Sequence, residues 1–283
     1  IKMIVGVIGL GLIGGSIAKA IKLQTDHTVL GYDISPTVVC KAQLVEAIDA
    51  PLGEEDLRRC DMVFLAIYPG DTVRFIRENI RGFKPGAIVL DACGVKRQVC
   101  QPLQSLVADA DFLFIGAHPM AGREFSGFEY SKENLFTSAS MILTPYSGTP
   151  IAKVDLVKKF CLEIGFGNVV ITSDDDHDHL IAYTSQLAHV VSNAYVKSPS
   201  ARRHKGFSAG SYRDLTRVAK LNEDMWSELF LCNSDYLIAE LDGLMENLAL
   251  YRKALADGDS ETLWQLLREG RELKEMLDQP EAE

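Results

Sequence analysis

"MIVGVIGLGLIGGSIAKAI", residues 3–21, runs from a short β-branched segment into a glycine-rich turn and then into an apolar helical pattern. Its glycines follow the spacing G-x-G-x-x-G, in which the first closes a tight turn, the second lets the backbone approach a pyrophosphate, and the third packs the helix against the strand. The helix N-terminus then offers free N–H groups to the anion. The stretch therefore predicts a strand, turn and helix that bind a dinucleotide. The predicted contacts come from Gly9, Gly11, Leu12, Ile13 and Gly14.

The next apolar run supplies an acidic residue. It spans Thr28 to Tyr32 and is followed by Asp33, 24 residues after Gly9. A Rossmann-type dinucleotide fold places an acid at about this distance, where it binds the ribose hydroxyls. A carboxylate also repels a 2′-phosphate, and no arginine follows directly in GYDISPTVV, so the sequence predicts NAD rather than NADP. The alternative is a strand-end aspartate in an ordinary turn.

Further apolar runs recur at the spacing of an α/β fold, with helical stretches such as residues 72–80 and 95–107 between them. Continuous apolar strands that alternate with helices indicate a parallel sheet covered on both faces. We therefore expect an α/β fold that begins with a Rossmann-type, doubly wound parallel sheet. Ligands bind beyond the carboxyl ends of such strands, where YPGDT, DACGVK and HPMAGRE stand. The expected strands span residues 4–8, 28–32, 61–67, 87–93, 111–117, 138–145 and 168–172.

After Thr172 the pattern changes to helices alone. Ser173 and Asp176 stand at capping spacing, and apolar residues then recur at helical intervals. We expect a dinucleotide-binding domain over residues 1–172 and an all-α domain over residues 173–283. The apolar stripes from Met225 onward exceed what one small domain needs to cover, so we expect a homodimer through the helical domain; the alternative is a monomer with a self-packed bundle. The first apolar stripe consists of Leu180, Tyr183, Leu187, Val191 and Ala194.

The same helix carries a polar stripe opposite its apolar face, where ligand-facing groups would lie. For His189 alone, a surface or helix-pairing role is equally consistent with this position. A glycine-rich bend, GFSAGSYRDLTRVAK, then presents Arg213, Asp214 and Arg217 at the opening of a helix. Guanidinium groups bind carboxylates in a planar fork, which favours an anionic substrate. The polar stripe consists of Ala182, Gln186, His189 and Asn193.

Composition limits the partners and the compartment. The 283 residues, 47% of them hydrophobic, suffice for two domains. A net charge of −10 and a pI near 5.2 argue against nucleic acid as a partner, and the basic cluster at residues 202–205 is interpreted as a solvated loop. The apolar start contains glycines and Lys19, so we expect neither a signal peptide nor a membrane span. Six scattered cysteines without a C-x-x-C pair indicate reduced thiols and a cytoplasmic protein.

Several motifs follow one another along nearly the whole chain. After the glycine loop come D-x-x-x-V-K at residues 91–96, H-P-M-A-G-x-E at 118–124, S-Q-L-x-H at 185–189, and YRDLTRVA at 212–219 with an M-W pair at 225–226. In this order they resemble the prephenate dehydrogenase family of tyrosine biosynthesis. The middle motifs are specific, whereas the glycine loop occurs in many dinucleotide-binding proteins.

The resemblance implies an NAD-dependent oxidative decarboxylation of prephenate to 4-hydroxyphenylpyruvate. NAD takes a hydride from the hydroxyl-bearing ring carbon, the hydroxyl proton leaves, and the ring carboxylate departs as carbon dioxide. His118 matches the family's catalytic histidine, which holds the hydroxyl and accepts its proton. This role explains an imidazole in the turn after a strand, where Pro119 and Gly122 are expected to shape the backbone.

The same resemblance implies which residues bind the substrate. Arg217 matches an arginine that grips a substrate carboxylate, and His189 matches a helical histidine near the side-chain end of the substrate. Arg213 stands where relatives often carry lysine, near the same end. Glu124 matches an acid that pairs with active-site cations. Trp226 matches a position near the pocket, for which core packing is an equally good explanation.

Two positions depart from the family pattern. Many relatives have serine where DACGVK has Gly94, so a hydroxyl that would touch the substrate hydroxyl or His118 is absent; a water or Cys93 could take its place. Arg123 stands where relatives commonly carry threonine or serine, and its charge could contact a substrate carboxylate or point to solvent. Both residues are therefore candidate substrate contacts, and neither departure touches the catalytic imidazole.

Three other functions compete with prephenate dehydrogenase. An arogenate or dual-specificity cyclohexadienyl dehydrogenase would use the same residues on a substrate with an ammonium in place of the side-chain keto group. A β-hydroxyacid dehydrogenase shares the domain order but usually relies on a lysine base, and His118 argues against it. A non-catalytic dinucleotide sensor would need only the first domain, which leaves His118, His189 and Arg217 unexplained.

Overall fold

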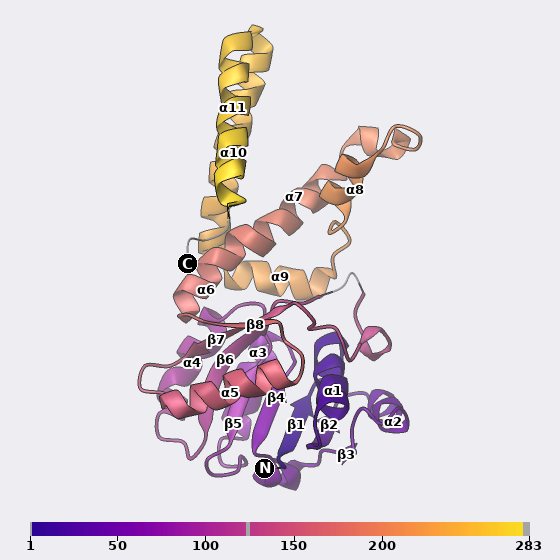
Figure 1. The fold of residues 1–283 in the computed structure, drawn as a ribbon, viewed down its shortest axis with the longest axis vertical. Coiled ribbons are helices and arrows are strands. Elements are labelled where there is room, and N and C mark those ends of the chain that lie inside the picture. The colour runs from indigo at the N-terminus through magenta and orange to yellow at the C-terminus, as the bar shows by residue number, and fades with distance from the viewer. Residues whose placement is uncertain (1, 123–124, 280–283) are drawn as a thin grey trace. The chain divides into compact units, whose positions relative to one another are not determined.

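The computed structural model describes residues 2–122 and 125–279 (Figure 1). The chain divides between Ser234 and Asp235 into two compact units. The first contains a β-sheet, the helices that cover it, and the first helices of the predicted α domain. The second consists of two long helices. The predicted domain boundary near residue 173 remains a proposal.

One eight-stranded sheet forms the centre of the first unit. Its strands lie in the order β3-β2-β1-β4-β5-β6-β7-β8, so the chain starts in the middle of the sheet and winds outward in both directions. This order confirms the predicted Rossmann-type, doubly wound α/β fold. The strands are β1 (Ile4–Ile8), β2 (Thr28–Tyr32), β3 (Ala50–Pro51), β4 (Met62–Leu65), β5 (Ile88–Asp91), β6 (Leu113–Pro119), β7 (Ser140–Pro145) and β8 (Asn168–Ile171).

The pairing between β6 and β7 differs from the prediction. It is antiparallel, with His118 opposite Ile142 and Pro119 opposite Met141, whereas the other pairings described are parallel. Because β7 accompanies β6 to its end, the strand continues to Pro119, two residues beyond the predicted limit. The prediction that His118 and Pro119 lie in the turn after the strand is therefore wrong. Both residues belong to the carboxyl end of β6.

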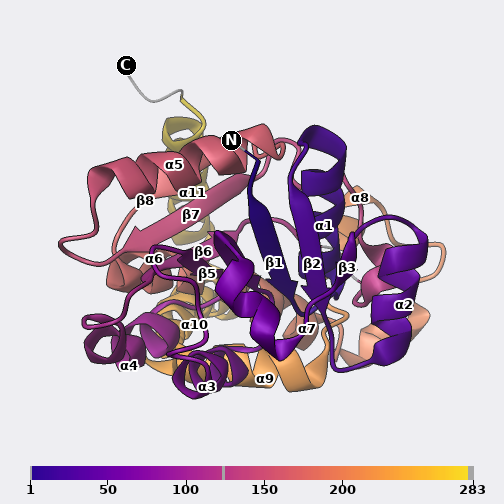
Figure 2. The ribbon, with the colours of Figure 1, turned by 90° about the horizontal axis from the view of Figure 1, so that it is seen from below.

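Helices cover both faces of the sheet, as the sequence predicted. Figure 2 shows α1 and α5 on one side and α3 and α4 on the other. Alternate residues of a strand face opposite sides, and in β4 Met62 and Phe64 join one buried apolar cluster while Val63 and Leu65 join another. The helices flanking the sheet are α1 (Leu12–Gln24), α2 (Pro36–Leu44), α3 (Pro69–Glu78), α4 (Arg97–Val107) and α5 (Ile151–Glu163).

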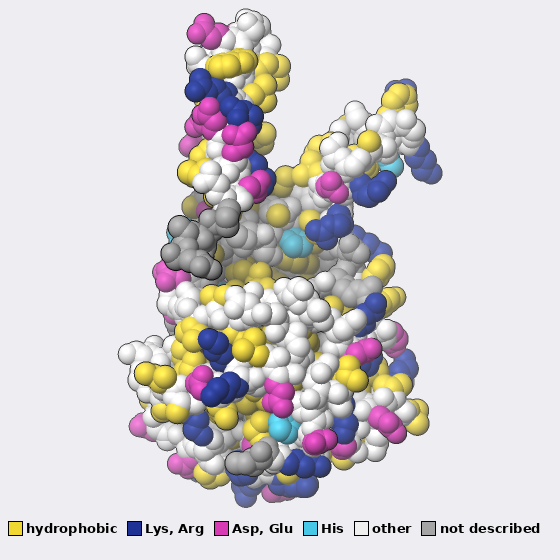
Figure 3. All heavy atoms as spheres, viewed as in Figure 1, with side chains coloured by type: hydrophobic (Ala, Val, Ile, Leu, Met, Phe, Trp, Pro, Cys, Tyr) yellow, Lys and Arg dark blue, Asp and Glu magenta, His cyan; other side chains and the backbone are white. Residues whose placement is uncertain are grey.

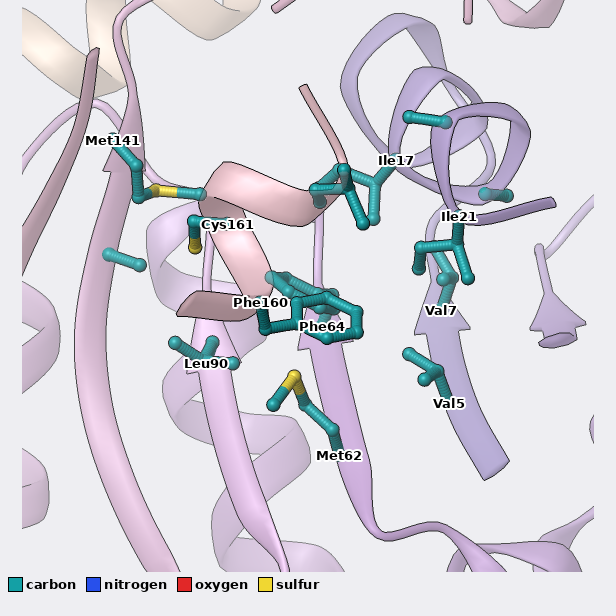
Figure 4. Packing of buried hydrophobic residues seen from close by; sticks show 14 of the residues in the cluster. Val5, Val7, Ile17, Ile21, Met62, Phe64, Leu90, Met141, Phe160 and Cys161 are labelled. Carbon is teal, nitrogen blue, oxygen red and sulfur yellow. The ribbon is translucent and has the colours of Figure 1, made fainter. Parts of the chain in front are cut away.

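Aromatic packing holds α5 to the sheet. Phe64 of β4 and Phe160 of α5 stack with ring centroids 6.0 Å apart, and Val7, Ile17 and Met62 surround them in the same cluster (Figure 4). Two aromatic rings bury a large apolar area, which dominates the stability of such a contact. The short connections η1 (Glu54–Arg59) and η2 (Phe128–Tyr130) complete this part of the unit.

The described residues after Thr172 form helices and no strand, as predicted. Leu180 and Tyr183 of the predicted apolar stripe are 62% and 60% exposed, while Leu187 is buried. In the first unit these helices are α6 (Asp174–Ile181), the π-helical turn η3 (Ala182–Leu187), α7 (Ala188–Tyr195), η4 (Pro199–Arg203), α8 (Gly210–Thr216) and α9 (Glu223–Cys232). The second unit contains α10 (Ser234–Asp257) and α11 (Ser260–Leu277). Among the described residues, none of these helices combines the length and apolar character needed to span a bilayer.

Candidate active site

The glycine loop between β1 and α1 has the geometry that its sequence predicts. Gly9 adopts a φ of +86°, and a Cβ there would lie 2.4 Å from the carbonyl oxygen of Ala66. A Cβ on Gly14 would lie 1.8 Å from the carbonyl oxygen of Gly9, so only glycine lets the helix start this close to the loop. A Cβ on Gly11, by contrast, would meet nothing within 4 Å. The backbone at Gly11 is therefore open to a ligand at the N-terminus of α1.

Asp33 lies beside this loop, at the end of β2. Its Oδ2 accepts a hydrogen bond from the backbone N–H of Leu10 at 2.9 Å, and its Oδ1 accepts one from Ser35 at 2.9 Å. The carboxylate remains partly exposed. The fold thus brings an acid and an open glycine turn together, which fits the ribose and pyrophosphate of a dinucleotide.

A buried ion pair lies at the carboxyl end of β5. Asp91 and Lys96 are both fully buried and contact each other directly. Burial lowers the pKa of Lys96, but the adjacent Asp91 carboxylate, together with Cys93 and Cys100, outweighs burial and raises the pKa above its usual value. Asp91 also accepts hydrogen bonds from the backbone N–H groups of Cys93 at 3.0 Å and Ala117 at 2.9 Å. The pair therefore connects the turn after β5 to Ala117 of β6, the residue before His118.

His118 projects from the end of β6 toward a second histidine. Its Nδ1 lies 2.8 Å from Nε2 of His177, and the rings pack edge to face. Burial, followed by the neighbouring His177 and Lys96, lowers the pKa of His118 well below its usual value, so the imidazole is neutral at pH 7. Its Nε2 faces Gly94, where a Cβ would lie 3.9 Å away. The predicted turn-shaping role of Gly122 finds no support, because Gly122 does not adopt a positive φ.

His177 continues this line of contacts to Asp178. The Nδ1 of His177 lies 2.7 Å from Oδ1 of Asp178, and both side chains are buried. Sequence analysis missed this pair because SDDDHDH resembles an ordinary acidic helix start. The available signal was the adjacent pair of His177 and Asp178. Their contact with α4, however, is visible only in the tertiary structure.

The helices after β8 present a second group of side chains. His189 of α7 stacks on Trp226 of α9 with ring centroids 4.1 Å apart, and its Nδ1 lies 2.7 Å from the carbonyl oxygen of Ser185. Burial lowers the pKa of His189; the Ser185 carbonyl opposes this shift and the positive charge of Arg217 adds to it. Arg217 therefore lies close enough to His189 to influence it. Arg213 of α8 and Arg217, the residue that follows α8, are both exposed.

The predicted polar stripe does not face a ligand along its whole length. Ala182 and Gln186 are buried. The amide nitrogen of Gln186 donates to the carbonyl oxygen of Leu229 at 3.1 Å, and its oxygen accepts from Asn233 at 2.9 Å. Both residues lie in the π-helical turn η3, and the hydrogen bond to Leu229 places Gln186 against α9. That part of the prediction is wrong, because the amide of Gln186 is satisfied within the protein.

Leu229 connects the two groups of side chains. Its carbonyl holds Gln186, and its side chain lies 3.4 Å from where a Cβ on Gly94 would be. Figure 3 shows a hollow in the surface between the sheet and helices α7 and α9, bordered by histidine and basic side chains. The predicted contacts Arg123 and Glu124 lie outside the described residues.

A dinucleotide loop, a neutral, partly exposed histidine at the same edge of the parallel strands, and a second histidine close to an arginine define the class of nucleotide-dependent oxidoreductases. Residues 17–171 match the family described as "Prephenate dehydrogenase, nucleotide-binding domain", and residues 173–269 match "Prephenate dehydrogenase, dimerization domain". The chain belongs to the prephenate dehydrogenase family.

Individual relatives extend over nearly the whole chain. It is 31% identical over 280 residues to a cyclohexadienyl dehydrogenase of Zymomonas mobilis, covering 95% of this chain and 94% of that protein. It is 29% identical to a prephenate dehydrogenase of Bacillus subtilis, covering 95% of this chain and 74% of the relative. The solved prephenate dehydrogenase of Aquifex aeolicus, in complex with hydroxyphenyl propionate and NAD+, superposes with a TM-score of 0.86 at 27% identity, covering 98% and 99% of the two chains.

Proposed function

We propose that this protein is an NAD-dependent prephenate dehydrogenase that converts prephenate to 4-hydroxyphenylpyruvate. The observation that carries the proposal is His118: it is neutral at pH 7, partly exposed, and held at the carboxyl end of β6, at the same edge of the parallel strands as the glycine loop after β1. A base must be neutral to accept a proton, and a histidine with a lowered pKa meets this requirement across the physiological range.

The cofactor is NAD, and the residues present fit it. The open backbone at Gly11 and the N-terminus of α1 receive the pyrophosphate, with Gly9, Leu12, Ile13 and Gly14 forming the rest of the loop. Asp33 binds the ribose hydroxyls and excludes a 2′-phosphate. When bound, NAD supplies the acceptor for the hydride.

His118 and the arginines divide the work on the substrate. Nε2 of His118 holds the ring hydroxyl beside Gly94 and accepts its proton as the carbonyl forms. Arg217 binds a substrate carboxylate by charge-assisted hydrogen bonds. His189 and Arg213 contact the side-chain end of the substrate. Arg123 and Glu124 complete the proposed binding residues, although they lie outside the described part of the chain.

A dual-specificity cyclohexadienyl dehydrogenase is the second candidate. It is favoured by the relative with that name, which matches this chain at 31% identity over almost the full length of both proteins. Arogenate carries an ammonium where prephenate has a keto group, so selectivity depends on the contacts near His189. A non-catalytic dinucleotide sensor remains a weaker alternative, since it has no use for His118 and Arg217.

The protein acts as a homodimer formed through its helical domain, residues 173–283. Two observations support this assembly: residues 173–269 match a dimerization domain, and apolar side chains such as Leu180, Tyr183 and Leu267 are exposed in the single chain. We place the enzyme in the cytoplasm because its six cysteines are free thiols, four of them buried.

The deciding experiment is steady-state NADH formation by the purified protein. Prephenate and arogenate are compared side by side, each with NAD and with NADP. We expect the highest kcat/KM with prephenate and NAD. Equal turnover of arogenate would establish the dual-specificity enzyme, and absence of turnover with either substrate would contradict the proposed function.

A further inference from the structure

We propose that His177 and Asp178 are positioning residues for His118: together they fix which nitrogen of His118 carries hydrogen, and so leave Nε2 free to accept the substrate proton. The inference deepens the proposed function and rests on it. It begins with a line of contacts, from Asp178 Oδ1 to His177 Nδ1 at 2.7 Å and from His177 Nε2 to His118 Nδ1 at 2.8 Å.

Asp178 is the fixed end of this line. Its Oδ1 accepts a hydrogen bond from the backbone N–H of Lys96 at 2.7 Å, and its Oδ2 accepts one from the backbone N–H of Arg97 at 2.9 Å. The guanidinium Nε of Arg97 lies 3.4 Å from the same Oδ2. These backbone groups form the N-terminus of α4, where a negative charge is stabilised. Because both carboxyl oxygens of Asp178 accept hydrogen bonds from backbone N–H groups, Asp178 is the acceptor in its contact with His177.

The hydrogen positions follow from this acceptor. His177 must donate from Nδ1 to Asp178, which leaves its Nε2 as an acceptor in the neutral ring. His118 must then donate from Nδ1 to His177, which leaves its own Nε2 without hydrogen. That nitrogen faces Gly94 and the proposed position of the substrate hydroxyl. The order of donors therefore runs from His118 to the buried carboxylate.

A doubly protonated His177 would reverse this order. It would donate to Nδ1 of His118 and force hydrogen onto Nε2, where it blocks the base. Burial opposes this state: burial and the positive charge of Lys96 together lower the pKa of His177 more than the Asp178 carboxylate raises it. Asp91, which contacts Lys96 directly, raises the pKa of His177, but the pKa stays below its usual value.

The arrangement also accommodates the reaction. The O–H bond of the substrate breaks, its proton goes to Nε2 of His118, and its electron pair forms the carbonyl as the hydride leaves to NAD. His118 then carries a positive charge while it still donates from Nδ1 to His177. The negative charge of Asp178, two hydrogen bonds away, stabilises that charge. Asp178 and His177 act through His118 and do not touch the substrate.

A direct test measures the hydrogen positions in the whole protein without substrate. ¹⁵N NMR of histidine-labelled enzyme distinguishes a protonated ring nitrogen from a bare one, and His118→Asn and His177→Asn assign the signals. At pH 8 we expect His118 to be protonated at Nδ1 and bare at Nε2, and His177 to show the same pattern. A neutral His118 with hydrogen on Nε2 overturns the inference. Because no turnover is required, this result is independent of whether prephenate is the substrate.

A second test is kinetic. In Asp178→Asn the amide NH₂ can face Nδ1 of His177 and reverse the order of donors, so kcat should fall by roughly 10²-fold or more, within the range of general-base catalysis. The decrease in kcat should persist at high pH. A variant whose fold is merely weakened would instead keep the parent's pH dependence of kcat. KM for prephenate and the Kd of NAD should remain nearly unchanged.

The matched control is Asp176→Asn, which makes the same change two residues earlier at an exposed position. We expect it to retain the parent's kcat and pH profile. A near-normal kcat for Asp178→Asn contradicts the positioning role. If Asp178→Asn fails to fold, the ¹⁵N measurement on the parent protein tests the positioning role instead.

Discussion

Gly94 lies against the proton-accepting nitrogen of His118. A Cβ added to Gly94 would be 3.9 Å from Nε2 of His118 and 3.4 Å from Cδ2 of Leu229. These are ordinary or slightly tight van der Waals distances, so the position has room for a small side chain. Glycine therefore leaves open the space beside the base where relatives often carry a serine hydroxyl.

The first prediction concerns this space. In Gly94→Ser the hydroxyl extends one bond beyond Cβ and can reach His118 or the substrate hydroxyl, whereas Gly94→Ala fills the space without a donor or acceptor. A hydrogen bond to a group that becomes charged contributes about 1.5–3 kcal/mol. We expect kcat/KM for prephenate to be roughly tenfold or more higher in the serine variant than in the alanine variant. Equal values would show that the hydroxyl does not reach the reacting groups.

The second prediction concerns the pH dependence of His118. The base works when it is neutral, so activity is lost as pH falls through its pKa. Burial, His177 and Lys96 lower that pKa below the usual histidine value of about 6.5, which means that the acidic limb of the kcat profile should lie below pH 6.5. His118→Asn should lower kcat by roughly 10²–10⁴-fold and remove the limb. An acidic limb above pH 6.5 in the parent, or one retained in the asparagine variant, would rule out His118 as the base.

The third prediction concerns cofactor choice. Asp33→Ser removes the negative charge that repels a 2′-phosphate, so the preference for NAD over NADP should narrow. Because Asp33 also accepts hydrogen bonds from Leu10 and Ser35, Asp33→Asn is the second variant: it keeps an acceptor oxygen and removes only the charge. Asp26→Ser, at an exposed acid before β2, is the control. Kinetics with both cofactors provide the measurement, and equal use of NAD and NADP by the parent would refute the role of Asp33.

The fourth prediction concerns the substrate carboxylate. Arg217→Ala removes a charge-assisted contact worth about 1.5–3 kcal/mol, so KM for prephenate should rise roughly tenfold or more while the Kd of NAD stays nearly unchanged. Arg203→Ala, at another exposed arginine of the same helical region, should leave both constants as they are. If KM does not change in the Arg217 variant, the carboxylate is bound elsewhere, with Arg213 or Arg123 as the next candidates.

The fifth prediction concerns assembly. Leu267 of α11 is 57% exposed in the single chain, and Leu267→Glu places a charge on a surface that we assign to the dimer. Sedimentation velocity should show weakened association, because burying an unpaired charge is unfavourable. Gln265→Glu, with the same charge on a neighbouring polar position, serves as the control. A parent protein that sediments as a monomer would contradict the proposed assembly.

The sequence by itself determined the fold class and the nucleotide loop. The spacing of Gly9, Gly11 and Gly14 is confined to one turn, where Gly9 takes a positive φ and a Cβ on Gly14 would clash with Gly9, and apolar periodicity is a property of neighbouring residues. The strands from β1 to β8 were therefore predicted to within a few residues, except the two-residue β3, which is too short to show a period. The HPMAG motif likewise identified His118 as a candidate before any partner was visible.

Only the tertiary structure decided what surrounds His118. Its partner His177 lies 59 residues further along the chain, and Asp178 becomes an acceptor because α4 directs two backbone N–H groups at it. The antiparallel pairing with β7 keeps His118 in an extended strand, where the sequence predicted a turn. Hydrogen bonds and burial depend on residues brought together from distant segments, and they set which nitrogen holds the proton and how far the pKa falls. Local sequence patterns do not predict those contacts. The protonation state of the His118 imidazole is therefore set only by the packing of the sheet against the helices.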